Sequence, residues 1–212
     1  MEGRPTAQLI ADHLRNQIVQ GVFLPGEQIK ESVLAAQLHT SRGPVREAVQ
    51  RLSQEGILVS RRNRGVFVLE LSPQDNKEIY AVREAMEITA ADALLDADPG
   101  HLRDTCRALS RILRSMAKQV TVSHWHNLAQ LDMEFHTTFV AGARNSRMSR
   151  IYETLAAEST MCILALENSY PRPTDLVHEH QTILNFLEAG NKQDLHHAIR
   201  RHLEKAVLDL AV

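Results

Sequence analysis

Four side chains that can bind a metal ion interrupt otherwise apolar helical stripes in the second half of the chain. Asp132 and His136 lie four residues apart, which places them about 40° apart on one helical face. His180 and His202 each lie on a further stripe of this kind. A carboxylate or imidazole that faces a core costs free energy unless it is paired. One shared divalent cation would pair all four groups, and this donor set predicts zinc, with nickel or manganese as alternatives.

A lone histidine in a core is more often structural than a metal ligand, so the alignment of four groups carries this prediction. The apolar neighbours on the three stripes are Leu128, Phe135, Phe139 and Val140; Leu176, Val177, Ile183, Leu184 and Leu187; and Leu195, Ala198 and Ala206. Three other histidines lie off these stripes, His178, His196 and His197, and we expect them to face solvent together with His124 and His126.

A positive charge repeats the pattern on an earlier helix, where Arg83 faces a predicted core. Its stripe consists of Ile79, Met86, Ala90 and Leu94. A guanidinium in such a place needs an anion. Glu87, four residues on, would supply a local ion pair, whereas a carboxylate ligand held beside the metal would pair with Arg83 bidentately. The sequence leaves both interpretations open.

A metal with an open coordination position could also activate water, which makes a metal-dependent hydrolase the rival class of protein. Glu134 is close in sequence to the candidate ligands, but it lies about 200° from Asp132 around the helix. It therefore faces away from the ligands, and no general base is positioned. We expect no enzymatic activity and no catalytic residues.

Helices must position these groups, and no strand alternation is evident after residue 71. Ser72, Pro73 and Asp75 fit a helix start, with a cap, a proline in the first turn and an acid. Turn residues then divide the segment into six predicted helices, at 73–96, 99–118, 122–143, 146–168, 173–189 and 192–211. Residues 71–212 are therefore predicted to form an antiparallel six-helix bundle, which makes the protein mainly α.

The first 70 residues predict a different unit, a helix-turn-helix followed by a β-hairpin wing. Helices are expected at 6–20, 30–38 and 41–55, and short strands at 57–60 and 66–68. The apolar faces of the first two helices are predicted from Leu9, Ile10, Leu14 and Ile18, and from Val33, Leu34 and Leu38.

The third helix of this unit carries the residues that could read DNA. Arg42 and Arg46 project from one side of its first turns, where arginine can contact guanine bidentately. Ser41 could bind a phosphate and Gly43 allows close approach. The loop residues Arg62, Arg64 and Gly65 would reach a flanking groove or its phosphates. The alternatives are a solvated basic loop and ion pairs of the helix arginines with Glu47 or Glu55.

Charge and composition restrict the class of protein. The formal net charge of −2 divides into +2 for residues 1–70 and −4 for residues 71–212, so DNA binding would depend on a local patch. The sequence contains neither a membrane span nor a signal peptide, and Cys106 and Cys162 form no paired motif, so a cytoplasmic protein with reduced thiols is expected.

Residues 21–68 resemble the winged helix of the GntR superfamily. The matching residues are Gly21, Pro25, Gly26, Leu34, Ala35, Leu38, Ser41, Arg42, the run from Pro44 to Ala48, Leu52, Gly56 and Gly65. The chain departs from the family at His39, where glycine is usual, and at Gly43, where threonine is common. The resemblance implies binding to double-stranded operator DNA. Because one winged helix reads a half-site, a homodimer is expected.

Residues 73–212 resemble the FCD-type ligand-binding domain of FadR- and VanR-like regulators. The resemblance rests on Arg83 with Glu87, on the segments 132–136 and 179–183, and on His202 followed by Leu203. It implies a divalent metal at Asp132, His136, His180 and His202, and a small organic acid facing Arg83. A repressor released by such an acid is the leading interpretation, and a regulator with a purely structural metal and no effector is the alternative.

Overall fold

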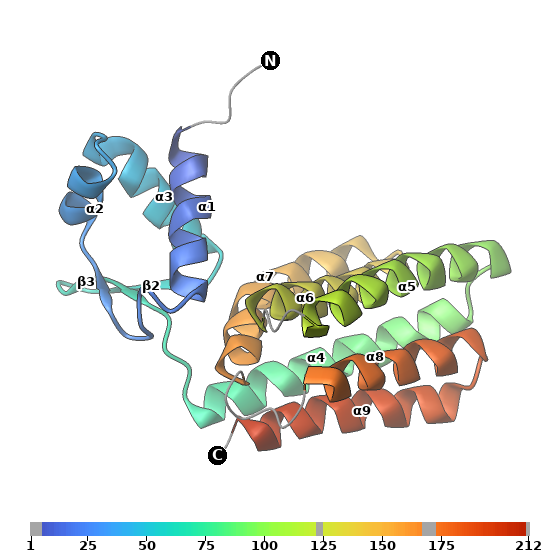
Figure 1. Ribbon diagram of the computed structural model, residues 1–212. Coiled ribbons are helices and arrows are strands. Elements are labelled where there is room, and N and C mark those ends of the chain that lie inside the picture. The colour runs from blue at the N-terminus through green and yellow to red at the C-terminus, as the bar shows by residue number, and fades with distance from the viewer. Residues whose placement is uncertain (1–5, 122–124, 167–172, 211–212) are drawn as a thin grey trace. The chain divides into compact units, whose positions relative to one another are not determined.

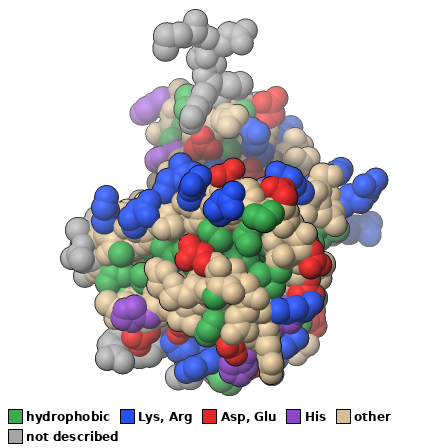
Figure 2. Space-filling view, turned by 90° about the vertical axis from the view of Figure 1, so that its right-hand side faces the viewer, with side chains coloured by type: hydrophobic (Ala, Val, Ile, Leu, Met, Phe, Trp, Pro, Cys, Tyr) green, Lys and Arg blue, Asp and Glu red, His purple; other side chains and the backbone are tan. Residues whose placement is uncertain are grey.

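The computed structural model describes residues 6–121, 125–166 and 173–210, and these divide into two compact units, 1–71 and 72–212 (Figure 1). Each unit has its own core and is described separately. Charged side chains of both signs lie on the molecular surface (Figure 2). Within the described ranges, no helix is both long enough and apolar enough to cross a membrane.

The first unit contains three helices, α1 (Thr6–Val19), α2 (Glu31–Gln37) and α3 (Arg42–Gln54), and a small antiparallel sheet. Its strands are β1 (Gln28–Ile29), β2 (Leu58–Arg61) and β3 (Gly65–Val68), in the order β1-β3-β2. The hairpin pairs Leu58 with Val68 and Arg61 with Gly65. This is a winged helix-turn-helix, as the sequence predicts. The sequence does not predict β1, because two residues are too short to show an alternating pattern.

The core of the first unit is formed by the inner faces of its helices and of its sheet. The buried apolar residues include Ile10, Leu14 and Ile18 of α1, Leu34 of α2, Val45, Val49 and Leu52 of α3, and Ile29, Leu58 and Val68 of the strands. The predictions that Leu9 and Val33 face inward are wrong, since they are 52% and 47% exposed. Each directly precedes a buried residue, Ile10 or Leu34. Neighbours in sequence lie about 100° apart on a helix, so a residue and its neighbour cannot both lie at the centre of one face.

Two local features lie at the start of α3, the helix that carries the candidate DNA-reading residues. His39, between α2 and α3, has φ +49°, a left-handed conformation that costs a non-glycine residue free energy and explains why glycine is usual there. Ser41 is the N-cap residue of α3, but its side chain makes no capping hydrogen bond. Its hydroxyl is therefore not committed to the helix end.

The second unit is a bundle of six helices among the described residues, as predicted. They are α4 (Pro73–Leu95), α5 (Pro99–Thr121), α6 (Trp125–Gly142), α7 (Ser146–Ala165), α8 (Pro173–Glu188) and α9 (Lys192–Asp209). Helices α5, α6 and α7 form one layer, and α8, α9 and α4 form the other (Figure 1). Helix α4 begins with a capping box between Ser72 and Asp75 and packs against α6, α7 and α9. Its inner face therefore reaches the centre of the bundle.

Candidate metal centre and DNA-reading surface

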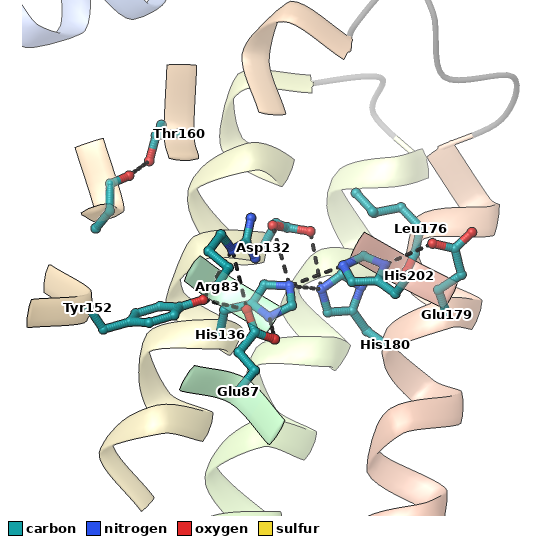
Figure 3. Close-up of polar contacts among 11 residues, drawn as sticks. Arg83, Glu87, Asp132, His136, Tyr152, Thr160, Leu176, Glu179, His180 and His202 are labelled. Atoms are coloured by element: carbon teal, nitrogen blue, oxygen red, sulfur yellow. Dashed lines mark hydrogen bonds and ion pairs between the residues drawn. The ribbon is translucent and has the colours of Figure 1, made fainter. Parts of the chain in front are cut away.

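The four candidate ligands meet at the centre of the bundle (Figure 3). Helix α6 contributes Asp132 and His136, α8 contributes His180, and α9 contributes His202. All four are buried, and one ligand atom from each lies within 4.8 Å of the others. The helical stripes that carry these residues in the sequence thus converge on one point in the fold.

The atoms that converge are one carboxylate and three Nε2 nitrogens. Nε2 of His136 lies 3.1 Å from Nε2 of His180 and 3.2 Å from Nε2 of His202. The carboxylate of Asp132 lies 3.1 Å from Nε2 of His180 and 3.8 Å from Nε2 of His136. One side of the group is bounded by Phe135, whose ring is edge-on to His136 and to His180.

Each imidazole has a hydrogen-bond acceptor on its opposite nitrogen. Nδ1 of His136 lies 2.8 Å from Glu87 Oε2, Nδ1 of His180 lies 2.7 Å from the carbonyl oxygen of Leu176, and Nδ1 of His202 lies 2.9 Å from Glu179 Oε2. Acceptors on Nδ1 assign the ring protons to that side. Three Nε2 lone pairs and a carboxylate then face one another. With all three rings neutral these groups repel one another, and a cation among the four would relieve the repulsion. Such outer acceptors are typical of metal-bound histidines.

The buried carboxylates and imidazoles of the site shift one another's pKa values. Burial opposes ionisation of Asp132, but His180 and the other imidazoles outweigh it and hold the pKa of the carboxyl well below its usual range. Burial also opposes ionisation of Glu87, yet His136 and Arg83 lower its pKa to about 2. Burial lowers the pKa of His136 to about 4 despite the neighbouring Glu87. Asp132 in turn outweighs burial and raises the pKa of His180. When all three imidazoles are neutral, as metal ligands must be, two carboxylates face one guanidinium, and a divalent cation would balance the excess charge. The donor set therefore fits a metal ion.

Beside the ligands, Arg83 is 1% exposed and belongs to a hydrogen-bonded group with Glu87 and Tyr152. Its Nε lies 3.3 Å from Glu87 Oε1 and 3.2 Å from the Tyr152 hydroxyl, which itself donates to Glu87 Oε1 at 2.6 Å. The guanidinium also lies over the ring of Tyr80, 5.0 Å from its centroid. The local ion pair with Glu87 therefore exists, but Arg83 Nη2 is buried without a hydrogen-bond partner among the described residues.

The other histidines differ from the expectation in one case. His178 and His197 are exposed, as expected, whereas His196 is partly buried and bonds Asp92 of α4 at 2.7 Å. The expectation for His196 is wrong because its helix lies against α4 at that point. His124 and the side chain of His126 lie outside what the structure describes. Histidines also appear on the surface in Figure 2.

Glu134 is exposed on the outer face of α6, so it faces away from the ligands as the sequence predicts. Sequence reasoning missed two other groups at the site, Tyr152 and Glu179. Tyr152 reaches Glu87 across 65 positions of sequence, and no local pattern indicates that contact. Glu179 directly precedes His180, but its contact with His202 depends on how α8 packs against α9, which no local pattern indicates.

On the first unit, the candidate DNA-reading residues lie on α3 and on the hairpin. Exposed residues among them are Ser41, Arg42, Gly43, Arg46, Arg62, Arg64 and Gly65. Arg46 pairs with Glu31 of α2, its Nε lying 3.4 Å from Oε2, and not with Glu47 or Glu55. Glu55 instead binds Arg15 of α1 at 2.7 Å. No Cβ contact would restrict a side chain at Gly43, so its surroundings are open.

A winged helix joined to a helical bundle with this buried His and Asp cluster defines a class, the DNA-binding transcriptional regulators with a sensor domain. The model for bacterial regulatory proteins of the gntR family matches residues 6–68, and the FCD domain model matches residues 78–205. The chain belongs to the GntR family and carries an FCD domain. GntR regulators bind operator DNA, and FCD domains bind metal ions and small-molecule effectors. Its relatives are transcriptional regulators and not enzymes.

Similar proteins support this assignment over most of the chain. A probable D-xylose utilization operon transcriptional repressor of Paenarthrobacter nicotinovorans is 30% identical over 93% of this chain and 85% of its own. The gluconate operon transcriptional repressor of Bacillus subtilis is 27% identical over 90% of this chain and 81% of its own. The fold matches that of a GntR regulator from Rhodococcus sp. RHA1, with a TM-score of 0.80, 24% identity and 97% coverage of both chains.

Proposed function

We propose that the bundle holds one divalent metal ion at Asp132, His136, His180 and His202, with zinc expected and nickel or manganese as alternatives. The observation that carries this proposal is the set of three Nε2 atoms whose opposite nitrogens all have acceptors. When bound, the ion would supply a Lewis-acidic position that can accept a carboxylate oxygen. The protein's own groups orient the imidazoles and keep solvent out.

The same region would bind a small organic acid, with Arg83 as its anion-binding residue. Nε of Arg83 already donates hydrogen bonds to Glu87 and to the Tyr152 hydroxyl, and these bonds fix the guanidinium in place. Nη2 remains buried and without a partner among the described groups, and a buried charged donor in this state is costly. A ligand carboxylate would satisfy it. A relative, the gluconate operon transcriptional repressor of Bacillus subtilis, is named after such an acid, which supports this class of effector.

The DNA-reading residues would be Ser41, Arg42, Gly43 and Arg46 on the recognition helix, with Arg62, Arg64 and Gly65 on the wing. A homodimer would present two winged helices to two half-sites of an operator. Acid binding would favour a conformation with lower operator affinity, so that the protein acts as a repressor released by its effector. Two of the similar proteins are named as repressors, which supports this direction.

The test is operator binding by the metal-loaded protein, titrated with a panel of mono- and dicarboxylic acids. We expect one class of acid to weaken operator binding by about 5- to 150-fold in wild type. Arg83→Lys, which keeps the buried charge but lacks the planar fork, should blunt this response without loss of metal. No response of wild type to any acid would favour the alternative, a regulator whose metal is purely structural.

A further inference from the structure

The outer face of α5 carries a stripe of basic side chains. Residues three, four and seven positions apart share a helical face, and five cations of this helix fall within about 80° of one another. All five are exposed: Arg103, Arg107, Arg111, Arg114 and Lys118. At 1.5 Å per residue the stripe is about 22 Å long. It concentrates positive charge in a segment, 71–212, whose net charge is −4.

The stripe is open to solvent because α5 lies at the edge of its layer (Figure 1). The helix packs mainly against α6 and α8, and its apolar face is buried there through Leu109, Leu113 and Met116. This face lies on the opposite side of the helix from the stripe. The four arginines border an open groove of about 840 Å³, in which the acidic lining residues are Asp104 and Glu188.

Most charges of the stripe lack a compensating acid. Arg107 pairs with Asp104 at 3.2 Å, but both side chains are 74% exposed, so this pair is weak. Within the described parts of the chain, no ion pair holds Arg103, Arg111 or Arg114. Like charges on successive turns of one helical face destabilise the helix. The row therefore does not serve the fold, and it favours a partner with several negative charges in a line.

The chemistry of this face distinguishes between possible partners. The centre of a protein interface is apolar, and none of the exposed large apolar side chains of the described residues lies on α5. A two-fold contact with a second copy would set the arginines against each other. Interfaces with DNA are instead polar and positively charged, and the arginine fork matches phosphate oxygens. A basic row along a helix also matches the regular phosphates of a duplex better than a compact ligand.

We infer that α5 is a second DNA-binding surface, which contacts the phosphate backbone of double-stranded DNA without reading its sequence. It acts in addition to the winged helix, whose unit has a net charge of only +2 over residues 1–70. Each phosphate that a cation neutralises releases counterions and steepens the fall of log affinity with log salt concentration by about 0.9. The stripe thus adds salt-dependent affinity for any duplex and leaves the choice of operator to α3 and the wing.

The test measures binding of the full-length protein to a random-sequence duplex by anisotropy, between about 50 and 200 mM salt. The triple variant Arg107→Gln, Arg111→Gln and Arg114→Gln should flatten the salt slope by about 2 to 3. Over this salt range, wild type should therefore lose about 40-fold more affinity than the triple variant. Lysine at the same three positions keeps the charge and should keep the slope.

A matched control removes three exposed charges from other helices of the bundle and should keep the wild-type slope: Lys77→Gln, Arg150→Gln and Arg201→Gln. An unchanged slope in the α5 variant, or an equal flattening in the control, would overturn the inference. Binding to labelled polyglutamate separates the rival partner. If the α5 variant keeps the DNA slope and loses polyglutamate, the stripe recognises an acidic protein surface and the inference is wrong.

Discussion

The carboxylate of Glu87 accepts a hydrogen bond from Nδ1 of His136 at 2.8 Å, and both residues are 1% exposed. The other oxygen of Glu87 is bonded by Arg83 and by Tyr152. One buried carboxylate thus contacts both the candidate anion-binding arginine and a candidate metal ligand. This contact links the two halves of the proposed site through a single side chain.

Glu87→Gln should weaken metal binding by about 10- to 100-fold, because the amide keeps the shape but loses the charge that fixes and polarises His136. The dissociation constant can be measured by competition with a chromophoric chelator. Glu84→Gln on the same helix is the control, since Glu84 pairs with Arg200 at 3.1 Å on the surface of the bundle. Equal metal affinity in the Glu87 variant and wild type would show that the contact does not position His136.

Removal of a ligand should abolish metal binding and lower the melting temperature, since part of the metal's binding energy stabilises the fold. His180→Ala removes a fully buried candidate ligand, whereas His178→Ala removes an exposed imidazole of the same helix. Elemental analysis should give about one ion per chain for wild type and His178→Ala, and almost none for His180→Ala. A chelator should lower the melting temperature of wild type and of His178→Ala, but not that of His180→Ala. Equal metal content in the two variants would contradict the assignment.

The ligand set could be predicted from the sequence because helical periodicity is a local property. Asp132 and His136 share a face by their spacing, and an apolar stripe marks that face as buried. The contacts of Tyr152 and Glu179 could not be predicted in this way, because they depend on how α7 and α9 pack against α4 and α8. The same limit explains Arg46, whose partner Glu31 lies on a different helix and not among its sequence neighbours.

The buried pair of Arg83 and Glu87 also makes a prediction about stability. Arg83→Ala leaves the Glu87 carboxylate buried with less compensation, which should cost about 3–5 kcal/mol of unfolding free energy. Arg200→Ala breaks an ion pair that is 49% and 35% exposed at its two side chains, and should cost less than about 1 kcal/mol. Urea unfolding of the metal-loaded variants measures both. An equally small loss of unfolding free energy in Arg83→Ala and Arg200→Ala would mean that Glu87 finds another partner when Arg83 is removed.

On specific DNA, Arg42→Ala and Arg46→Ala should each cost about 1–3 kcal/mol of binding free energy, if they contact base edges. Arg62→Ala and Arg64→Ala should weaken binding to all sequences more evenly and flatten its salt dependence, if they contact phosphates. Anisotropy titrations at several salt concentrations, on a duplex selected from random sequences and on an unrelated duplex, separate the two effects. Full operator affinity in an Arg42 and Arg46 double alanine variant would contradict the recognition-helix assignment.

The ion pair between Arg46 and Glu31 predicts a substitution that strengthens operator binding instead of weakening it. Arg46 is 64% exposed at its side chain, and its guanidinium must leave Glu31 or share it when it contacts DNA. The Glu31 carboxylate would also lie near the phosphates and repel them. Glu31→Gln should therefore tighten operator binding by about two- to fivefold, the range expected for one exposed ion pair. Glu78→Gln changes the net charge equally but lies in the bundle, and it should leave the affinity unchanged. Weaker binding by the Glu31 variant would show that Glu31 holds Arg46 in its reading position instead of competing with DNA for it.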